Sequence, residues 1–181
     1  LPILKVKINT RGMEQAPKDG RFLLVCNHLA EIDPVALMTV FRKSQLAFIS
    51  KQENDRLFLA GPFLRAILCQ PINRENDREA LKTILRCIQL IKEDKVSIGA
   101  FPEGGILVKD KLSHFRNGIF KIAQKAGVPI VVCTLKGTSD LFHNMKRLKP
   151  TPVQLHLVDV IPAEEVKAAN TVELGEKIYQ M

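Results

Sequence analysis

A histidine and an aspartate stand five residues apart in the segment NHLAEIDP, residues 27–34. Together they could form a general base and its orienting carboxylate: Asp33 holds one ring nitrogen of His28, and the other nitrogen takes a proton from a hydroxyl. On an ideal helix this spacing leaves the two side chains roughly 140° apart, so they meet only if the chain turns between them. Asp33 followed by Pro34 is typical of a helix N-cap. We therefore expect His28 in a loop and Asp33 turned back towards it, although the spacing alone also fits an Asp33 that is only a cap.

A second candidate segment is FPEGG, residues 101–105, which follows an apolar run. It holds the carboxylate of Glu103 at the end of an expected strand. Gly104 and Gly105 permit tight backbone geometry and the close approach of a ligand. Taken alone, this segment also fits a solvated turn with an exposed glutamate.

Two further segments have weaker chemical content. PINR, residues 71–74, ends in Arg74, whose planar guanidinium suits a phosphate because it donates two parallel hydrogen bonds. Alone, Arg74 also fits an ordinary surface charge. GVPIVV, residues 127–132, is the end of a helix running into a buried strand, which is scaffold.

The elements that would position these residues alternate between short apolar runs and longer segments of helical periodicity. This pattern predicts an α/β fold, with a mostly parallel or mixed central sheet flanked by helices. Strands are expected at residues 3–8, 21–26, 46–49, 96–101, 130–135 and 153–160. The last of these strands alternates apolar and polar residues cleanly. No linker or repeat divides the chain, so residues 1–181 are expected to form one domain.

Three helical segments stand out. Residues 76–93 place an apolar stripe along one face, formed by Leu81, Ile84, Leu85, Ile88 and Ile91. Residues 115–126 should end at Gly127. Residues 57–68, LFLAGPFLRAIL, are apolar almost all round and broken in the middle by Gly61-Pro62. This last segment fits either a membrane-facing or acyl-contacting element or a buried kinked helix.

The amino-acid composition limits which binding partners and which cellular compartment fit this chain. The 181 residues include four cysteines without the spacing of a metal or redox motif, which we interpret as reduced core residues of a cytosolic protein. The net charge of +8 predicts attraction to anions, and the absence of Trp with a single Tyr argues against nucleic acid. No run reaches the ~18 apolar residues of a spanning helix. The chain begins at Leu1, which leaves open an upstream anchoring segment.

In this order, NHLAEIDP, PINR, FPEGG and GVPIVV resemble the four blocks of the 1-acyl-glycerol-3-phosphate acyltransferase family, over about residues 20–138. The resemblance implies transfer of a fatty acyl group from a thioester, on coenzyme A or acyl carrier protein, to the hydroxyl of a lysophospholipid, giving phosphatidate. It implies that His28 is the base, Asp33 its partner, and Arg74, Glu103 and Gly104 the acceptor site. It implies no metal and no cofactor besides the thioester co-substrate. The expected location is the cytoplasmic side of an anionic membrane, either peripheral or anchored.

The sequence departs from the family in its third block, where Gly105-Ile106-Leu107 replace the usual Thr-Arg-Ser. A hydroxyl and a cation are thereby lost from the expected phosphate site, and Lys109 or Lys111 could supply the charge. Other acceptors, such as glycerol 3-phosphate or another lysolipid, stay open. So does a lipid-binding module without turnover, although a pure binder needs no base. Hydrolysis of the thioester is also open, but the Gly-x-Ser-x-Gly elbow of serine esterases is absent.

Overall fold

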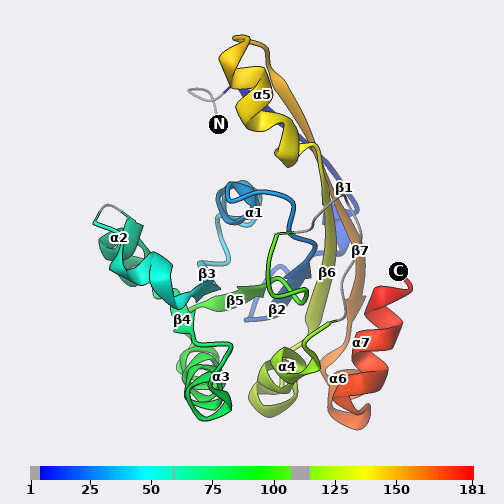
Figure 1. The fold of residues 1–181 in the computed structure, drawn as a ribbon. Helices are drawn as coiled ribbons and strands as arrows, with labels where there is room; N and C mark the ends of the chain where they lie inside the picture. Colours follow the sequence, from blue (N-terminus) through cyan, green and yellow to red (C-terminus); the bar gives the residue numbers. More distant parts are fainter. Residues whose placement is uncertain (1–4, 59, 107–114) are drawn as a thin grey trace.

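A computed structural model describes residues 5–58, 60–106 and 115–181. Within these ranges the chain forms a seven-stranded sheet with helices on both faces (Figure 1). The strands are β1 (Val6–Arg11), β2 (Leu23–Cys26), β3 (Leu46–Lys51), β4 (Gln70–Ile72), β5 (Ser97–Ala100), β6 (Ile130–Lys136) and β7 (Thr151–Ile161). The helices are α1 (Asp33–Val40), α2 (Ala60–Ala66), α3 (Asp77–Lys92), α4 (Phe120–Ala126), α5 (Leu141–Lys146), α6 (Ala163–Ala168) and α7 (Thr171–Tyr179).

The sheet is mixed, with the order β1-β7-β6-β2-β5-β3-β4. Strands β6, β2, β5, β3 and β4 run parallel to one another, whereas β7 is antiparallel to β6 and β1 is parallel to β7. The predicted α/β fold with a mixed central sheet is confirmed. The parallel block matters for the site, because the carboxyl ends of β2, β5, β3 and β4 all lie at one edge.

Both faces of the sheet are covered, which explains why β2 is apolar throughout. Leu23 and Val25 point into a core shared with α3, α4, α6 and α7, whereas Leu24 and Cys26 point into a second core shared with α1 and α5. A parallel strand buried on both faces is expected to be a continuous apolar run. All four cysteines are free and buried in these two cores, as expected for core residues.

Strand β7 has one buried and one exposed face, as its sequence alternation predicted. Val153, Leu155 and Leu157 are buried, and Gln154 and His156 between them are exposed. The strand that sequence reasoning did not identify is β4, which has only three residues and contains a proline. Proline is tolerated there because β4 is an edge strand.

Helix α3 occupies nearly the predicted residues and is capped by Asn76, whose side chain accepts hydrogen bonds from two amides of the first turn. The predicted apolar stripe is partly wrong. Leu81 and Leu85 are 54% and 56% exposed. The buried face of the helix follows a different line of residues, spaced three, one and three apart. These residues are Ile84, Cys87, Ile88 and Ile91. Leu81 and Leu85 lie to one side of that line.

Helices α2 and α4 correct two further boundaries. Gly61 and Pro62 lie in the first turn of α2 and do not break it in the middle, because a proline in the first turn removes no helical hydrogen bond. Helix α4 begins at Phe120, after a 3₁₀ turn, and ends as predicted where Gly127 adopts a φ of 73°. Among the helices in the described ranges, none is long and apolar enough to cross a membrane.

Candidate active site

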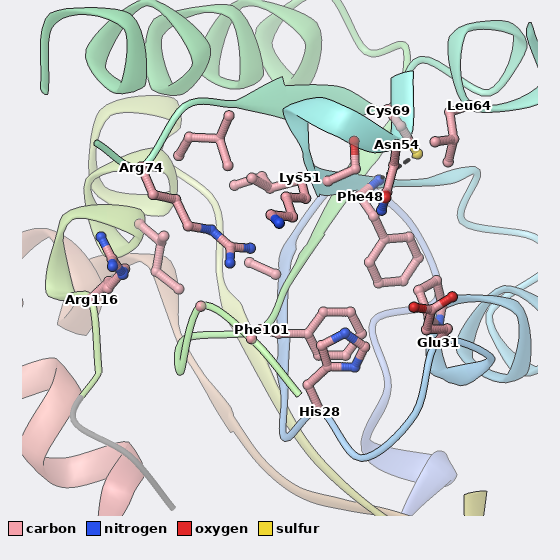
Figure 2. A pocket seen from close by; sticks show the side chains of 18 of the residues that line it. His28, Glu31, Phe48, Lys51, Asn54, Leu64, Cys69, Arg74, Phe101 and Arg116 are labelled. Atoms are coloured by element: carbon pink, nitrogen blue, oxygen red, sulfur yellow. Dashed lines mark hydrogen bonds between the residues drawn. The ribbon is translucent and has the colours of Figure 1, made fainter. Parts of the chain in front are cut away.

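The predicted site residues follow neighbouring parallel strands. His28 comes two residues after β2, Glu103 three residues after β5, and Arg74 two residues after β4. Since β2 pairs with β5, β5 with β3 and β3 with β4, the topology brings all three to the same edge of the sheet. A pocket of about 640 Å³ opens at this edge and is lined by His28, Arg74 and Gly104 among others (Figure 2).

His28 and Asp33 meet as their spacing required. Nδ1 of His28 lies 2.9 Å from Oδ2 of Asp33, whose side chain is fully buried. The His28 side chain is 17% exposed and lines the pocket. Because a carboxylate oxygen only accepts, Nδ1 carries the proton, and Nε2 is left with a lone pair for a substrate. The pair therefore has the geometry of a general base and its orienting partner.

Asp33 is not the N-cap of α1, contrary to our expectation. Ile32 occupies the cap position, and Asp33 is the first helical residue. Its Oδ2 accepts hydrogen bonds from the backbone amides of Leu29 at 2.6 Å and Ala30 at 2.8 Å. The carboxylate thus turns back to the loop that carries His28 and fixes the shape of that loop as well as the imidazole. The carboxylate therefore stabilises the loop before α1 and does not cap the helix. Pro34, in the first turn, is the residue there that favours the start of the helix.

Asn27 joins the start of this loop to the neighbouring strand β6. Its Nδ2 donates to the carbonyl oxygen of Leu135 at 3.0 Å, and its Oδ1 accepts from the amide of Leu135 at 2.7 Å. The side chain therefore continues the β2–β6 pairing beyond Cys26 and Cys133, the last paired residues of the ladder. This contact fixes the residue immediately before the base.

Aromatic stacking on one face of the His28 ring also restrains it. The ring centroids of His28 and Phe101 lie 4.1 Å apart with an interplanar angle of 13°, and Phe101 in turn stacks on Phe48 at 5.6 Å. Figure 2 shows the His28 and Phe101 rings lying face to face at the wall of the pocket. The imidazole is thus restrained both by Asp33 and by the end of β5.

Glu103 lies behind the pocket wall. It is 9% exposed, and the lining from this segment comes from Phe101, Gly104, Gly105 and Ile106. Burial raises the pKa of its carboxyl, and this effect is opposed by hydrogen bonding to backbone amides, including that of His28, and by the nearby imidazole of His28. Its acceptor-binding role stays a prediction, whereas its position supports the loop that carries the base. Gly104 lines the pocket with a φ of 76°.

One side of the pocket is cationic. Lys51, Arg74 and Arg116 line it, and in Figure 2 the guanidinium of Arg74 reaches into the pocket on the side of Lys51. Burial lowers the pKa of Arg74, the positive charge of Arg116 lowers it further, and Glu53 acts in the opposite direction. Such an arrangement favours an anion. Lys109 and Lys111, expected to replace the missing cation, lie outside the described residues.

The rest of the lining is largely apolar. Side chains from α1, α2, β3 and α3 contribute to it, including Met38, Phe63, Leu64, Ile67 and Ile84. His28 therefore lies in a pocket that offers both an apolar wall and a cationic wall. In the described ranges, no three His, Cys, Asp or Glu side chains are grouped so that they could hold a metal ion. Base, apolar wall and cations together suit an amphiphilic anion with a reacting hydroxyl.

The chain is thus an α/β protein with a His–Asp pair at the carboxyl edge of the parallel part of its sheet. A sequence model of the acyltransferase family matches residues 7–136, and the chain belongs to this family. That span contains all four segments that carried the resemblance, the last of which ends at residue 132. The predicted family is confirmed.

Named relatives agree with this assignment. The chain is 31% identical to a probable 1-acyl-sn-glycerol-3-phosphate acyltransferase of Mycoplasma pneumoniae, over 85% of this chain and 58% of that protein. It is 29% identical to the 1-acyl-sn-glycerol-3-phosphate acyltransferase of Bacillus subtilis, over 98% of this chain and 92% of that protein. The chain thus spans little more than half of the first relative and nearly all of the second.

A solved structure has the same fold. The 1-acyl-sn-glycerophosphate acyltransferase PlsC of Thermotoga maritima superposes with a TM-score of 0.76, covering 98% of this chain and 69% of that chain at 24% identity. The mixed sheet and its flanking helices are therefore an established architecture.

Sequence reasoning missed four residues that contribute to the site: Asn27, Lys51, Phe101 and Arg116. Asn27 and Phe101 stand inside segments that it singled out, so adjacency to the motif was the available signal. Lys51 is the last residue of β3, at the same edge of the sheet, so its position at the end of an expected strand was the available signal. Arg116 follows no strand and had no sequence signal.

Proposed function

We propose that this chain transfers a fatty acyl group from a thioester to the free hydroxyl of 1-acyl-glycerol 3-phosphate, giving phosphatidate. The observation that carries the proposal is the His28–Asp33 pair, at 2.9 Å, opening onto a pocket with one apolar and one cationic wall. The names of the relatives, 1-acyl-sn-glycerol-3-phosphate acyltransferases, support the same acceptor.

The reaction follows from the geometry in two steps. Nε2 of His28 takes the proton of the acceptor hydroxyl as its oxygen attacks the thioester carbonyl carbon, and Asp33 stabilises the imidazolium that forms. The tetrahedral intermediate then collapses, the carbon–sulfur bond breaks, and the imidazolium returns the proton to the leaving thiolate. An ester and a free thiol result. The hydroxyl attacks directly, so the mechanism uses neither an acyl-enzyme nor a metal.

The two walls would orient the acceptor. Apolar side chains such as Leu64 and Ile67 suit an acyl chain, whereas Arg74 suits the phosphate. With both ends held, the free hydroxyl of the glycerol is directed towards His28. Glu103 stays a candidate for the acceptor site, acting through the loop that it supports. The thioester carrier is either coenzyme A or acyl carrier protein.

The test is incubation with acyl-CoA and 1-acyl-glycerol 3-phosphate while free thiol and phosphatidate are measured together. Equal amounts of the two products are expected. His28→Ala should lower kcat by a factor on the order of 10² or more while the protein stays folded, because it removes only the base. Thiol release without phosphatidate would indicate hydrolysis. An inactive wild type that still binds lipid would support the lipid-binding module instead.

We also propose that the protein works at the cytoplasmic side of an anionic membrane. Helix α5 and the turn after it expose Phe142, Met145 and Leu148 next to Lys146 and Arg147. Apolar side chains surrounded by cations suit an anionic lipid surface. The buried free thiols agree with a reducing compartment.

A further inference from the structure

The cationic wall of the pocket contains a residue that no motif contributes. Arg116 lies just before the 3₁₀ turn that leads into α4, and it lines the pocket together with Arg74 and Lys51. It contacts the same segment in which the family's usual cation is replaced by Ile106. We infer that Arg116 makes this site selective for an acceptor that carries a phosphomonoester, an inference that rests on the proposed function.

The backbone and the side chain of Arg116 are both held by the FPEGG segment. Its amide donates to the carbonyl oxygen of Pro102 at 2.9 Å. Its side chain covers Gly104: a Cβ at that position would lie 2.9 Å from Nε and 3.1 Å from Cδ of Arg116. The glycine therefore leaves the space that the arginine occupies. This contact places the Arg116 side chain beside the loop that follows β5, on the side of the pocket where Figure 2 shows Arg74.

Arg116 and Arg74 are close enough to repel each other. The charge of Arg116 contributes to lowering the pKa of Arg74, which is half-buried. Among the described residues, neither arginine forms an ion pair or a side-chain hydrogen bond with a carboxylate. Glu53, whose charge acts on Arg74, pairs with Lys51 at 3.3 Å. Two guanidiniums without a carboxylate partner in the wall of one pocket are stabilised by an anion that binds there.

A phosphomonoester fits this requirement better than a single-charged anion. It carries about −1.5 to −2 charges near pH 7 and three acceptor oxygens, so it can accept from two guanidinium forks at once. Two carboxylates also line the pocket, Glu31 and Asp77. Glu31, which lies across the pocket from Arg74 and Arg116 in Figure 2, would oppose an anion on its own side. The cationic wall is thus the part of the pocket where a phosphate can bind.

The experiment compares two acceptors that differ only in the phosphate, 1-acyl-glycerol 3-phosphate and 1-acylglycerol, at a fixed thioester concentration. Arg116→Ala should raise KM for the phosphorylated acceptor by about ten- to a hundredfold, the range expected for a lost charged hydrogen bond. It should leave KM for the thioester and kcat/KM for 1-acylglycerol unchanged. Arg116→Lys should give a KM for the phosphorylated acceptor between those of wild type and Arg116→Ala, because lysine keeps the charge but lacks the planar fork of hydrogen-bond donors. Arg86→Ala, an exposed arginine of α3 outside the pocket, is the matched control and should change none of these constants.

Three outcomes overturn the inference. KM for the phosphorylated acceptor could stay within about twofold of wild type, which is inside the range of a surface substitution. The thioester KM could rise alone, which would assign Arg116 to the phosphates of the carrier. Both acceptors could lose kcat/KM equally, which would make Arg116 a support for the FPEGG loop.

A binding measurement separates this inference from the proposed function. Calorimetric titration with glycerol 3-phosphate requires no turnover. If wild type transfers no acyl group to any acceptor, the proposed function fails, and the titration still decides the role of Arg116. Weaker binding by Arg116→Ala than by Arg86→Ala supports it, and equal binding refutes it.

Discussion

Asp33 combines two roles at the residue scale, although the first differs from the cap that the sequence indicated. One oxygen, Oδ2, accepts from the imidazole and from two loop amides. The sequence could indicate that the aspartate and the histidine cooperate, because only a turn brings them together. It could not show that the turn is held by the carboxylate itself, since Asp-Pro fits a cap equally well.

Replacing Asp33 by asparagine separates these roles. An amide oxygen still accepts from the loop, so we expect a loss of about 1–2 kcal/mol in the free energy of unfolding. The amide cannot stabilise an imidazolium, so kcat should fall by at least about 10². Urea denaturation and steady-state kinetics measure the two effects. Asp140→Asn, at an exposed position outside the pocket, is the control. An unstable variant with full activity would show that Asp33 serves the loop alone.

Glu103 gives a pH-dependent prediction. Burial raises its pKa above the usual 4.5, so the folded protein binds the proton more tightly than the unfolded chain does. Its contribution to stability is therefore complete below that usual pKa and is lost as pH rises through the folded-state value. Glu103→Gln removes this loss. The free energy of unfolding of the variant, relative to wild type, should increase from below pH 4.5 to about pH 7. A difference that is constant or decreases with pH, measured by urea denaturation, would contradict the assignment.

At the scale of elements, the parallel strands were largely predictable and the short helices were not. Strands β2 and β6 are apolar on both faces, which makes them visible as runs in the sequence. Strand β5 is fully buried as well, with Ile98 and Ala100 in one core and Ser97 and Gly99 on its other face. Strand β4 is too short to produce such a run, and α2 was misjudged because its proline falls in the first turn and not in the middle. The rotation of α3 about its axis depends on which of its side chains pack against the sheet. This is a property of the tertiary structure that helical periodicity alone does not determine.

Asn27 tests how an element positions the base. Asn27→Asp keeps an acceptor for the amide of Leu135 but loses the donor to its carbonyl oxygen and places a negative charge there. We expect the free energy of unfolding to fall by about 1–3 kcal/mol. Because His28 would shift, kcat should fall roughly tenfold while KM for the acceptor changes little. Asn9→Asp, which adds the same charge at an exposed position of β1, should have neither effect. A raised KM without a change in kcat would place Asn27 in substrate binding.

At the scale of the whole molecule, the net charge of +8 predicted attraction to anions but not where the anion binds. The structure separates two groups of cations. One group lines the pocket, and the other lies next to the exposed apolar residues of α5 and of the turn after it. Composition alone cannot make this distinction, because it depends on which loops the fold brings together.

The second group gives the last prediction, that α5 and the turn after it hold the protein on anionic membranes. Each basic residue at such a surface contributes about 1 kcal/mol at low salt, and the attraction weakens with screening. The double change Arg147→Gln with Lys149→Gln should therefore weaken binding to anionic vesicles by about 2 kcal/mol, roughly thirtyfold. The matched control is Lys121→Gln with Lys125→Gln, which removes the same charge from exposed positions of α4, on the opposite face of the sheet.

Vesicle sedimentation measures this binding at low and high salt, with neutral vesicles in parallel. Wild type should bind anionic vesicles more tightly than neutral ones, and the difference should shrink at high salt because the charges are screened. The α5 variant should lose most of the difference, whereas the α4 variant should keep it. Equal weakening by both variants would mean that overall charge, and not α5, drives binding. Equal binding of wild type to neutral and anionic vesicles would refute the electrostatic contribution and leave the exposed Phe58 and Phe63 beside the pocket as the membrane contact.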